Sequence, residues 1–379
     1  MNKENISAII LAAGMSTRMG AFKPLMPIGN TTAIENIIRV FRLAGIGDIS
    51  IITGFRAKDV SSALKHLDVR LVLNESYADG MLSSIKTGIK NLQPECEAFF
   101  ILPTDIPLVR LATVNALSAA CQPGRIYYPT FQERRGHPPL ISTYFSRNIM
   151  NFSGKGGLQA FLARNKSSAV DVAVTDPGIL LDMDTKPDYR RILARYRQYQ
   201  IPTPDECLVL LNENFDAGEE VIDHGKIVAK VALALGKAIQ QSKSDLNLDL
   251  LVAAGLLHDL ARNQRDHARV AMQILNNLDY PAVAEIVGVH MDIRFEDEKA
   301  ISEKEVVFLA DKLVSGTRIV DLKARFDTAI RRYGSEPDVL ANIKSRMSSA
   351  LKIKHRVEQL AGRSLEAIVG PMVLSGTAL

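Results

Sequence analysis

Residues 9–20 of the chain read IILAAGMSTRMG, and Lys23 follows three positions later. The run Ile6–Ala12 is almost wholly apolar, which is typical of a strand buried on both faces, and it passes directly into a loop of small residues. Consecutive backbone N–H groups in such a loop can approach an anion closely, and Arg18 and Lys23 add positive charge beside it. The residues alone leave two interpretations open: a phosphate-binding loop, or a strand-ending turn with two basic neighbours.

The first half of the chain alternates short apolar runs with amphipathic segments. Strands are expected at Ile6–Ala12, Asp48–Thr53, Val69–Leu73 and Ala98–Leu102, and helices at Thr32–Ala44, Ala57–His66 and Gly80–Leu92. This order predicts a mostly parallel sheet with helices on both faces. Further strand-like runs predict a mixed edge to the sheet, and a last helix closes the domain: Arg125–Thr130, Pro139–Thr143, Val170–Val174 and Gly178–Met183, then Pro187–Tyr199.

The pattern changes near residue 200, where the segment QIPTP at positions 200–204 has the composition of a linker. Beyond it, apolar residues recur at helical spacing, and helices are expected at Gly225–Gln241, Leu248–Ala261, His267–Leu278, Pro281–His290 and Glu303–Val314. The sequence therefore predicts a Rossmann-like α/β domain at residues 1–199 and an all-α domain at residues 205–370.

The overall composition favours a soluble globular protein. The length of 379 residues suits two or three domains, and the net charge of +4 is small. No run approaches the ~20 apolar residues of a membrane span, and aromatic residues do not interleave with the basic ones as in many nucleic-acid-binding proteins. Cys96, Cys121 and Cys207 form neither a zinc motif nor a disulfide framework. We expect a cytoplasmic protein with neither nucleic acid nor membrane as partner.

One acidic residue follows a buried-type strand of the first domain. Asp105 lies in the segment PTDIP directly after the apolar run Ala98–Leu102. Open α/β sheets bind ligands at the carboxyl ends of their strands, and Mg²⁺ favours one or two carboxylates together with phosphate oxygens. Asp105 is thus a candidate Mg²⁺ ligand, although an aspartate that starts a turn before proline is also common.

Histidine and aspartate gather in the second half. Four of the seven histidines lie between positions 224 and 290, and His258-Asp259 ends an otherwise apolar helical run. His224 and Asp311 also lie on or beside apolar helical faces. Any one buried histidine is usually just a hydrogen-bonded core residue, but burying an unpaired aspartate costs several kcal/mol. Imidazoles with carboxylates are ligands for Zn²⁺, Mn²⁺ or Fe²⁺.

The motif LAAGxSxRMGxxK resembles the signature of MobA-like nucleotidyltransferases, and most resembles molybdenum cofactor cytidylyltransferases, over roughly the first 195 residues. The resemblance implies that the loop wraps the triphosphate of an incoming nucleotide and that Arg18, Lys23 and Asp105 are catalytic. It implies nucleotide-binding roles for Leu11, Ala12, Ala13, Gly14, Ser16, Arg18, Lys23 and Asp105.

Three further segments carry the same resemblance. Asn74, Gly80 and Ser83 match a region near the nucleotide, and ordinary loop and N-cap chemistry would also explain them. The acceptor side is implied for Arg135, Gly136, His137 and Pro138, where an arginine pair with a histidine suits an anionic acceptor; a turn with solvated arginines is the alternative. Asp184, in LDMDTKPDY at positions 181–189, matches a second Mg²⁺ ligand, and a helix N-cap role is equally plausible.

The order H…HD…D resembles the HD phosphohydrolase superfamily over roughly residues 205–320. The resemblance implies that His224, His258, Asp259 and Asp311 bind a divalent transition metal such as Mn²⁺, Fe²⁺ or Zn²⁺. His267 and His290 match the extra histidines of members that hold two metals. The usual Lys or Gly after H-D-x is replaced here by Ala261-Arg262, which leaves the catalytic subtype open.

Together the two resemblances imply a bifunctional enzyme. The first half would transfer CMP from CTP to molybdenum cofactor (molybdopterin) with Mg²⁺ and release pyrophosphate, and a molybdoenzyme or its accessory protein is a candidate partner. The second half would hydrolyse a phosphoester. One alternative keeps the transferase but gives it a sugar, polyol or isoprenoid phosphate as acceptor. In another, the HD half is a nucleotide-sensing or structural metal module.

Overall fold

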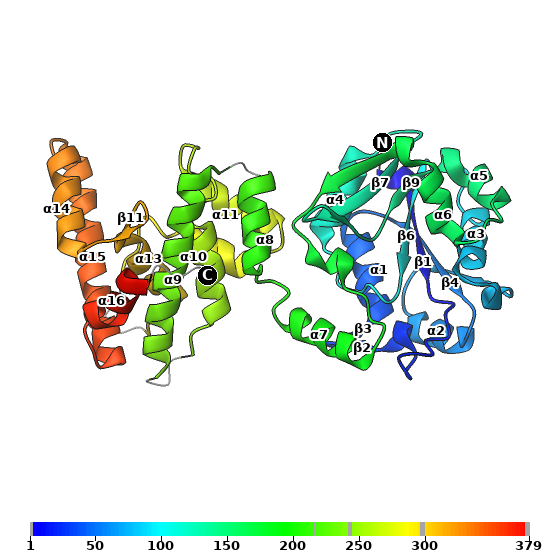
Figure 1. Cartoon of the computed structure of the whole chain (residues 1–379), viewed down its shortest axis with the longest axis horizontal. Helices are drawn as coiled ribbons and strands as arrows, with labels where there is room; N and C mark the ends of the chain where they lie inside the picture. The colour runs from blue at the N-terminus through cyan, green and yellow to red at the C-terminus, as the bar shows by residue number, and fades with distance from the viewer. Residues whose placement is uncertain (1–2, 215–216, 242–244, 296–299, 376–379) are drawn as a thin grey trace. The chain divides into compact units, whose positions relative to one another are not determined.

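The structure is a computed structural model that describes residues 3–214, 217–241, 245–295 and 300–375. The chain divides into two compact units, residues 1–199 and 200–379 (Figure 1). None of the helices in the described ranges is long and apolar enough to cross a membrane.

A mixed but mostly parallel sheet forms the centre of the first unit. Its strand order is β10 (Ala169–Ala173), β7 (Ile126–Phe131), β9 (Leu140–Ser142), β6 (Ala98–Pro103), β1 (Ile6–Leu11), β4 (Asp48–Thr53) and β5 (Arg70–Leu73), and β8 (Arg134–Arg135) pairs with β7. Strands β6, β1, β4 and β5 are parallel, and so are β10 and β7, whereas β9 runs antiparallel to both of its neighbours. The predicted mostly parallel sheet is therefore confirmed.

Helices cover both faces of this sheet, as Figure 1 shows. They are α1 (Ala33–Leu43), α2 (Ala57–Leu64), α3 (Met81–Lys90), α4 (Leu111–Ala120), α5 (Ser146–Asn151), α6 (Gly157–Arg164) and α7 (Lys186–Arg197). Strand β1 serves two cores, because Ala8 and Ile10 face one side of the sheet and Ile9 and Leu11 the other. This double burial explains why β1 is apolar except at Ser7. The residues after Leu11 lie at the carboxyl edge of the sheet.

The predicted strand at Gly178–Met183 is wrong. Residues Pro177–Leu180 form a 3-10 turn instead, because the Asp176 side chain caps it by accepting a hydrogen bond from the Gly178 N–H at 2.8 Å. The other carboxylate oxygen of Asp176 accepts from the Arg110 N–H and the Thr113 hydroxyl, both at 2.7 Å. This buried side chain overrides the strand-like pattern of the residues that follow it.

The second unit is built from helices: α8 (Pro204–Val209), α9 (Glu219–Gln240), α10 (Leu248–Leu257), α11 (His267–Asn277), α12 (Pro281–Val287), α13 (Glu303–Lys312), α14 (Leu322–Tyr333), α15 (Pro337–Ala361) and α16 (Leu365–Ser375). Glycines let α9 and α10 touch backbone to backbone. A Cβ at Gly225 would lie 2.7 Å from the Leu256 carbonyl oxygen, and one at Gly255 would lie 2.7 Å from the Ala229 Cα. This close approach brings His224 beside His258.

The all-α prediction for this unit needs one correction. Two short strands, β11 (Val314–Ser315) and β12 (Arg318–Ile319), form an antiparallel hairpin after α13. Gly316, with a φ of 58°, makes the turn between them. Two-residue strands leave no alternating pattern in a sequence, so the unit is helix-rich rather than all-α.

Candidate active sites

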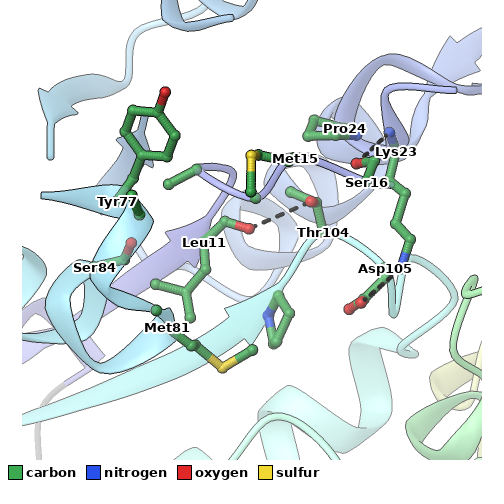
Figure 2. A pocket seen from close by; sticks show the side chains of 15 residues that line it. Leu11, Met15, Ser16, Lys23, Pro24, Tyr77, Met81, Ser84, Thr104 and Asp105 are labelled. Atoms are coloured by element: carbon green, nitrogen blue, oxygen red, sulfur yellow. Dashed lines mark hydrogen bonds and ion pairs between the residues drawn. The ribbon is translucent and has the colours of Figure 1, made fainter. Parts of the chain in front are cut away.

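The loop after β1 lines a cavity of about 330 Å³ at the carboxyl ends of β1 and β6 (Figure 2). Ser16 Oγ accepts a hydrogen bond from the Lys23 backbone N–H at 3.1 Å, and the Thr104 hydroxyl donates to the Leu11 carbonyl at 3.3 Å. These bonds fix the loop against the end of β6. The lining residues are Leu11, Ala13, Gly14, Met15, Ser16, Lys23, Pro24, Tyr77, Ala78, Gly80, Met81, Ser84, Pro103, Thr104 and Asp105.

Lys23 lies between the two predicted carboxylates at the edge of this cavity. Its Nζ is 2.5 Å from Asp184 Oδ1 and 3.3 Å from Asp105 Oδ2. Burial alone would lower the pKa of Lys23, but the hydrogen bonds and charges of Asp184 and Asp105 outweigh it and raise the pKa. Two carboxylates from distant parts of the chain thus converge on one cation, and this donor set fits Mg²⁺, which binds few carboxylates together with phosphate oxygens.

Two residues of the predicted loop do not line the cavity. The Ala12 N–H donates to the Ile52 carbonyl at 2.9 Å, so the sheet uses this amide. The Arg18 side chain is 79% exposed and lies 3.3 Å from Asp184 Oδ2. Arg18 is therefore at the rim, where a long charged side chain can still reach a phosphate that enters.

Asn74 and Ser83 do not line the cavity. Asn74 Nδ2 donates to Ser83 Oγ at 2.8 Å and to Ser84 Oγ at 3.0 Å. Gly80, with a φ of 100°, ends the preceding turn so that α3 begins at Met81. Asn74 and Ser83 thus fix the segment that contributes Gly80, Met81 and Ser84 to the cavity lining.

A second cavity of about 550 Å³ adjoins the first, because Met81 and Pro103 line both. Three residues of the predicted acceptor segment line it, namely Arg135, Gly136 and His137, and Pro138 does not. Burial lowers the pKa of the His137 imidazole despite the charges of Asp105 and Asp182. His137 is therefore a neutral ring at pH 7.

The side chain of Arg135 is held in the wall of this second cavity by contacts with Asp171 and Tyr128. Its Nε and one terminal nitrogen donate to the two carboxylate oxygens of Asp171 at 2.5 and 3.0 Å. Its guanidinium carbon lies 4.5 Å from the centre of the Tyr128 ring. The hydrogen bond to Asp171 raises the pKa of Arg135, so its charge is permanent but already compensated.

In the second unit, three of the predicted metal-ligand histidines bond to the backbone through the same ring nitrogen. The Nδ1 atoms of His224, His258 and His290 lie 2.8, 2.8 and 2.7 Å from the carbonyl oxygens of Gly316, Gly255 and Val287. A carbonyl oxygen can only accept, so each Nδ1 carries a proton. A ring that carries its proton on Nδ1 alone presents the lone pair of Nε2, which is the arrangement of metal-binding histidines.

These Nε2 atoms face carboxylates. Asp311 Oδ1 lies 3.3 Å from His224 Nε2 and 3.7 Å from His258 Nε2, and Asp259 Oδ2 lies 3.5 Å from His258 Nε2. His258 Nε2 is buried without a hydrogen-bond partner in the described part of the chain. Burial would lower the pKa of His258, but Asp259 and Asp311 outweigh it and raise the pKa. A buried lone pair beside carboxylates requires a positive charge between them, either a proton or a metal ion.

Asp259 also belongs to a second group of ligands. Its Oδ1 lies 3.4 Å from His267 Nε2 and 3.7 Å from His290 Nε2. Two groups, His224–His258–Asp259 and Asp259–His267–His290, each have their donor atoms within 4.8 Å of one another. All six predicted ligands therefore meet in one cluster, which we call the buried cluster. Its nitrogen and oxygen donors fit Mn²⁺, Fe²⁺ or Zn²⁺.

Family models match both halves of the chain. A MobA-like NTP transferase domain matches residues 8–170, and an HD domain matches residues 221–316. The chain joins a MobA-like nucleotidyltransferase domain to an HD domain. HD domains form a family of metal-dependent phosphohydrolases, so both halves have enzyme relatives.

Named relatives each match about half of the chain. Molybdenum cofactor cytidylyltransferase of Escherichia coli K12 is 26% identical over 195 residues, which are 51% of this chain and 98% of the relative. Nicotine blue oxidoreductase of Paenarthrobacter nicotinovorans is 28% identical over 198 residues, 50% of this chain and 96% of the relative.

Solved structures also match about half of the chain. The protein Rv0371c of Mycobacterium tuberculosis H37Rv matches with a TM-score of 0.46 at 26% identity over 51% of this chain and 100% of its own. A nucleotidyl transferase of Methanothermobacter thermautotroptrophicus matches with a TM-score of 0.47 at 22% identity over 51% of this chain and 98% of its own.

Some site residues of both domains carry no family motif. In the transferase domain, Tyr128 and Lys166 line the second cavity, and nothing in their local sequence marks them. In the HD domain, Lys312 Nζ lies 2.6 Å from Asp311 Oδ2 and 3.3 Å from the His290 carbonyl oxygen. A lysine next to a candidate ligand in an apolar helix is a signal that the sequence does contain.

Proposed function

We propose that the transferase domain transfers CMP from CTP to the phosphate of molybdenum cofactor and releases pyrophosphate. The observation that carries the proposal is the convergence of Lys23, Asp105 and Asp184 beside the loop that lines the first cavity. The second cavity adjoins this point and offers room for an acceptor. The similarity to a molybdenum cofactor cytidylyltransferase supports the choice of CTP and of the acceptor.

The proposed reaction needs no covalent enzyme intermediate. An oxygen of the acceptor phosphate attacks the α-phosphorus of CTP, the bond to the bridging oxygen breaks, and pyrophosphate leaves with that electron pair. Amides of the loop, Arg18 and Lys23 would stabilise the charge on the phosphates. Asp105 and Asp184 would hold Mg²⁺, which neutralises phosphate charge when bound.

For the HD domain we propose hydrolysis of a small phosphoester. His224, His258, Asp259 and Asp311 would hold one divalent ion such as Mn²⁺, Fe²⁺ or Zn²⁺, and Asp259, His267 and His290 a second. Such ions, when bound, supply an activated water at neutral pH. The unpartnered, buried Nε2 of His258 supports this assignment. We propose that residues 1–199 form the transferase domain and residues 205–370 the HD domain.

Other acceptors fit the same transfer chemistry, including sugar, polyol and isoprenoid phosphates. The name of the second relative raises an oxidoreductase function for the first half. Hydride transfer, however, makes no use of two carboxylates that converge on a cation, and the geometry around Lys23 therefore favours transfer to a phosphate.

Pyrophosphate release from CTP, GTP, ATP or UTP by the full chain, with Mg²⁺ and molybdenum cofactor, tests the transferase proposal. Release that requires both CTP and the cofactor supports it. Release with another nucleotide, or with a sugar or polyol phosphate in place of the cofactor, would reassign the substrate. No release under any condition would refute transfer.

Phosphate release from nucleoside monophosphates, with and without added Mn²⁺, tests the HD proposal. Release that rises with Mn²⁺ and is lost in His258→Ala supports hydrolysis. Full metal occupancy without phosphate release would favour the alternative of a sensing or structural metal module.

A further inference from the structure

Lys312, the last residue of α13, is a buried cation beside the buried cluster, with only 10% of its side chain exposed. Its Nζ donates to Asp311 Oδ2 at 2.6 Å and to the His290 carbonyl oxygen at 3.3 Å, and lies 4.9 Å from the centre of the Phe308 ring. A carboxylate, a carbonyl and a ring face account for the three donors of an ammonium. Lys312 is therefore not a free charge for a substrate.

The contact between Lys312 and Asp311 does not follow from the helix itself. Consecutive residues of a helix point roughly 100° apart around its axis and do not normally face each other. The Lys312 side chain instead turns back toward Phe308, one turn earlier, and this brings the ammonium to Asp311. Burying an ammonium in this way is costly unless it is paired, so the pair with Asp311 is what keeps Lys312 in the interior.

This pair fixes the orientation of the Asp311 carboxylate. Lys312 holds Oδ2, while Oδ1 lies 3.3 Å from His224 Nε2 and 3.7 Å from His258 Nε2. Oδ1 is thus the oxygen that faces the two imidazoles. A carboxylate without this contact could turn and offer both oxygens.

The second hydrogen bond of Lys312 reaches the other side of the buried cluster. Its acceptor is the carbonyl of His290, whose Nδ1 donates to the Val287 carbonyl and whose Nε2 lies 3.7 Å from Asp259 Oδ1. Asp311 is carried by α13, whereas His290 follows α12. Lys312 therefore joins two candidate ligands from different segments of the chain.

We propose that Lys312 is a positioning residue of the HD site. It fixes which oxygen of Asp311 meets a divalent ion, and it compensates the charge of Asp311 when no ion is bound. It acts through Asp311 and the His290 backbone and does not contact the substrate. This role deepens the proposed function of the HD domain and rests on its metal ligands, but not on the hydrolysis reaction.

Thermal unfolding of the full chain, measured by calorimetry in EDTA and in Mn²⁺, tests this role. Lys312→Met removes the charge and leaves Asp311 buried without its counter-ion, so the Tm of the HD domain in EDTA should fall. Mn²⁺ should restore it, so that the rise in Tm on adding Mn²⁺ is roughly twice that of wild type or more. Lys312→Arg keeps the charge and should resemble wild type. The transition that His258→Ala makes insensitive to Mn²⁺ identifies the HD domain.

Bound Co²⁺ gives a second readout, because its visible absorption weakens as more ligand atoms surround it. Lys312→Met frees Asp311 Oδ2, so Co²⁺ in this variant should absorb less than in wild type or Lys312→Arg. Lys304→Met is the matched control, since Lys304 also joins α13 to α12 by an ion pair, with Glu285, away from the buried cluster. It should leave the Mn²⁺ response and the Co²⁺ spectrum unchanged.

A purely structural role would lower the Tm of Lys312→Met equally in EDTA and in Mn²⁺ and leave the Co²⁺ spectrum unchanged, and this result would overturn the proposal. Effects of Lys304→Met as large as those of Lys312→Met would also overturn it. If Lys312→Met does not fold in either condition, the double variant Lys312→Met/Asp311→Asn decides. A folded double variant supports action through Asp311, whereas an unfolded one shows that Lys312 is needed for packing and refutes the proposal.

These readouts are independent of catalysis. If wild type binds Mn²⁺ but releases no phosphate, hydrolysis is refuted, and the expected changes in Lys312→Met would still support its role. If wild type hydrolyses a nucleoside monophosphate and Lys312→Met matches it in both readouts, the role of Lys312 is refuted and hydrolysis stands. Failure of wild type to bind either Mn²⁺ or Co²⁺ would refute both.

Discussion

The two sites of this chain use similar side chains in opposite surroundings. In the transferase domain, Asp105 and Asp184 are partly exposed and share Lys23 as a counter-ion. In the HD domain, Asp259 and Asp311 are buried and face histidine nitrogens, one of which has no hydrogen-bond partner among the described residues. Both sites contain protein counter-ions, because Arg262 pairs with Asp259 and Lys312 with Asp311 in the HD domain. The HD site differs in that the unpartnered Nε2 of His258 is buried beside these carboxylates, which suits a bound metal ion.

This difference indicates how each site would use a metal. A partly exposed carboxylate pair can exchange its lysine for a cation at small cost, because solvent screens both states. A metal there can arrive and leave with each nucleotide. Buried carboxylates and imidazoles pay a large penalty when they are left uncompensated. We therefore expect a substrate-borne ion in the transferase domain and a resident ion in the HD domain.

The largest effect is expected from Asp105→Ala. The change removes one of the two carboxylates beside Lys23 and should lower CMP transfer by roughly a thousandfold, as for other groups that stabilise transition-state charge. Metal bound to the HD domain should stay at the wild-type level. Pyrophosphate release and elemental analysis of the same preparation measure both quantities. Asp182→Ala, an exposed aspartate outside the cavity lining, is the control. Transfer that survives Asp105→Ala would remove the carboxylate pair from the mechanism.

His258→Ala should have the opposite effect to Asp105→Ala, because it should remove metal from the HD domain and spare CMP transfer. It removes the nitrogen at the centre of the buried cluster, and metal affinity should fall by more than about a hundredfold, so that dialysis removes the ion. Transfer should be unchanged. His355→Ala, on the exposed side of α15, is the matched control. Metal retained by His258→Ala would refute this ligand set and the contrast between a resident and a substrate-borne ion.

Local sequence patterns predicted the elements that carry these sites. The apolar run of β1, the small residues after it and the position of Asp105 after β6 are local features, and parallel strands bring their carboxyl ends to one edge. In the HD domain, the apolar helical runs predicted the helices, whereas the set of six candidate ligands came from the resemblance to the HD superfamily. The matched family domains confirm both assignments at the level of the fold.

Contacts between distant residues could not be predicted in the same way. Lys23 and Asp184 are 161 positions apart, and no local pattern shows that they share a hydrogen bond. The sequence leaves open whether Arg135 binds an anion or is solvated in a turn, and the structure pairs it instead with Asp171, 36 positions away. The strand expected at Gly178–Met183 failed for a similar reason, since a buried capping side chain decides the conformation there.

Glycines at a helix contact in each domain should respond differently to an added methyl group. A Cβ at Gly255 would meet the Ala229 backbone at 2.7 Å, whereas a Cβ at Gly88 of α3 would meet the Ile9 side chain at 2.5 Å. Backbone yields less than a side chain, so Gly255→Ala should cost about 3 kcal/mol of unfolding free energy and Gly88→Ala about 1–2 kcal/mol. Gly255→Ala should also weaken metal binding, because it separates His258 from His224.

Chemical denaturation and metal titration measure these two effects. Gly47→Ala, whose added Cβ meets no atom within 4 Å, controls for the backbone change alone. If Gly255→Ala bound metal as tightly as wild type, the buried cluster would not depend on the close contact of α9 and α10.

The smallest expected effect is the contribution of His137 to the pH dependence of thermal stability. Its pKa in the folded protein is lowered from 6.5 mainly by burial, so the unfolded chain binds the proton more readily. The stability that neutral His137 contributes is complete above pH 6.5 and is lost as the pH falls through the folded-state pKa. Between pH 7.5 and pH 5, wild type should therefore lose more thermal stability than His137→Gln, on the order of one or two degrees in Tm. His66→Gln, at a side chain that is 57% exposed, serves as the control. If the Tm of wild type and His137→Gln fell in parallel, burial would not hold the pKa of His137 below that of the unfolded chain, and the imidazole would not be a neutral ring in the wall of the second cavity.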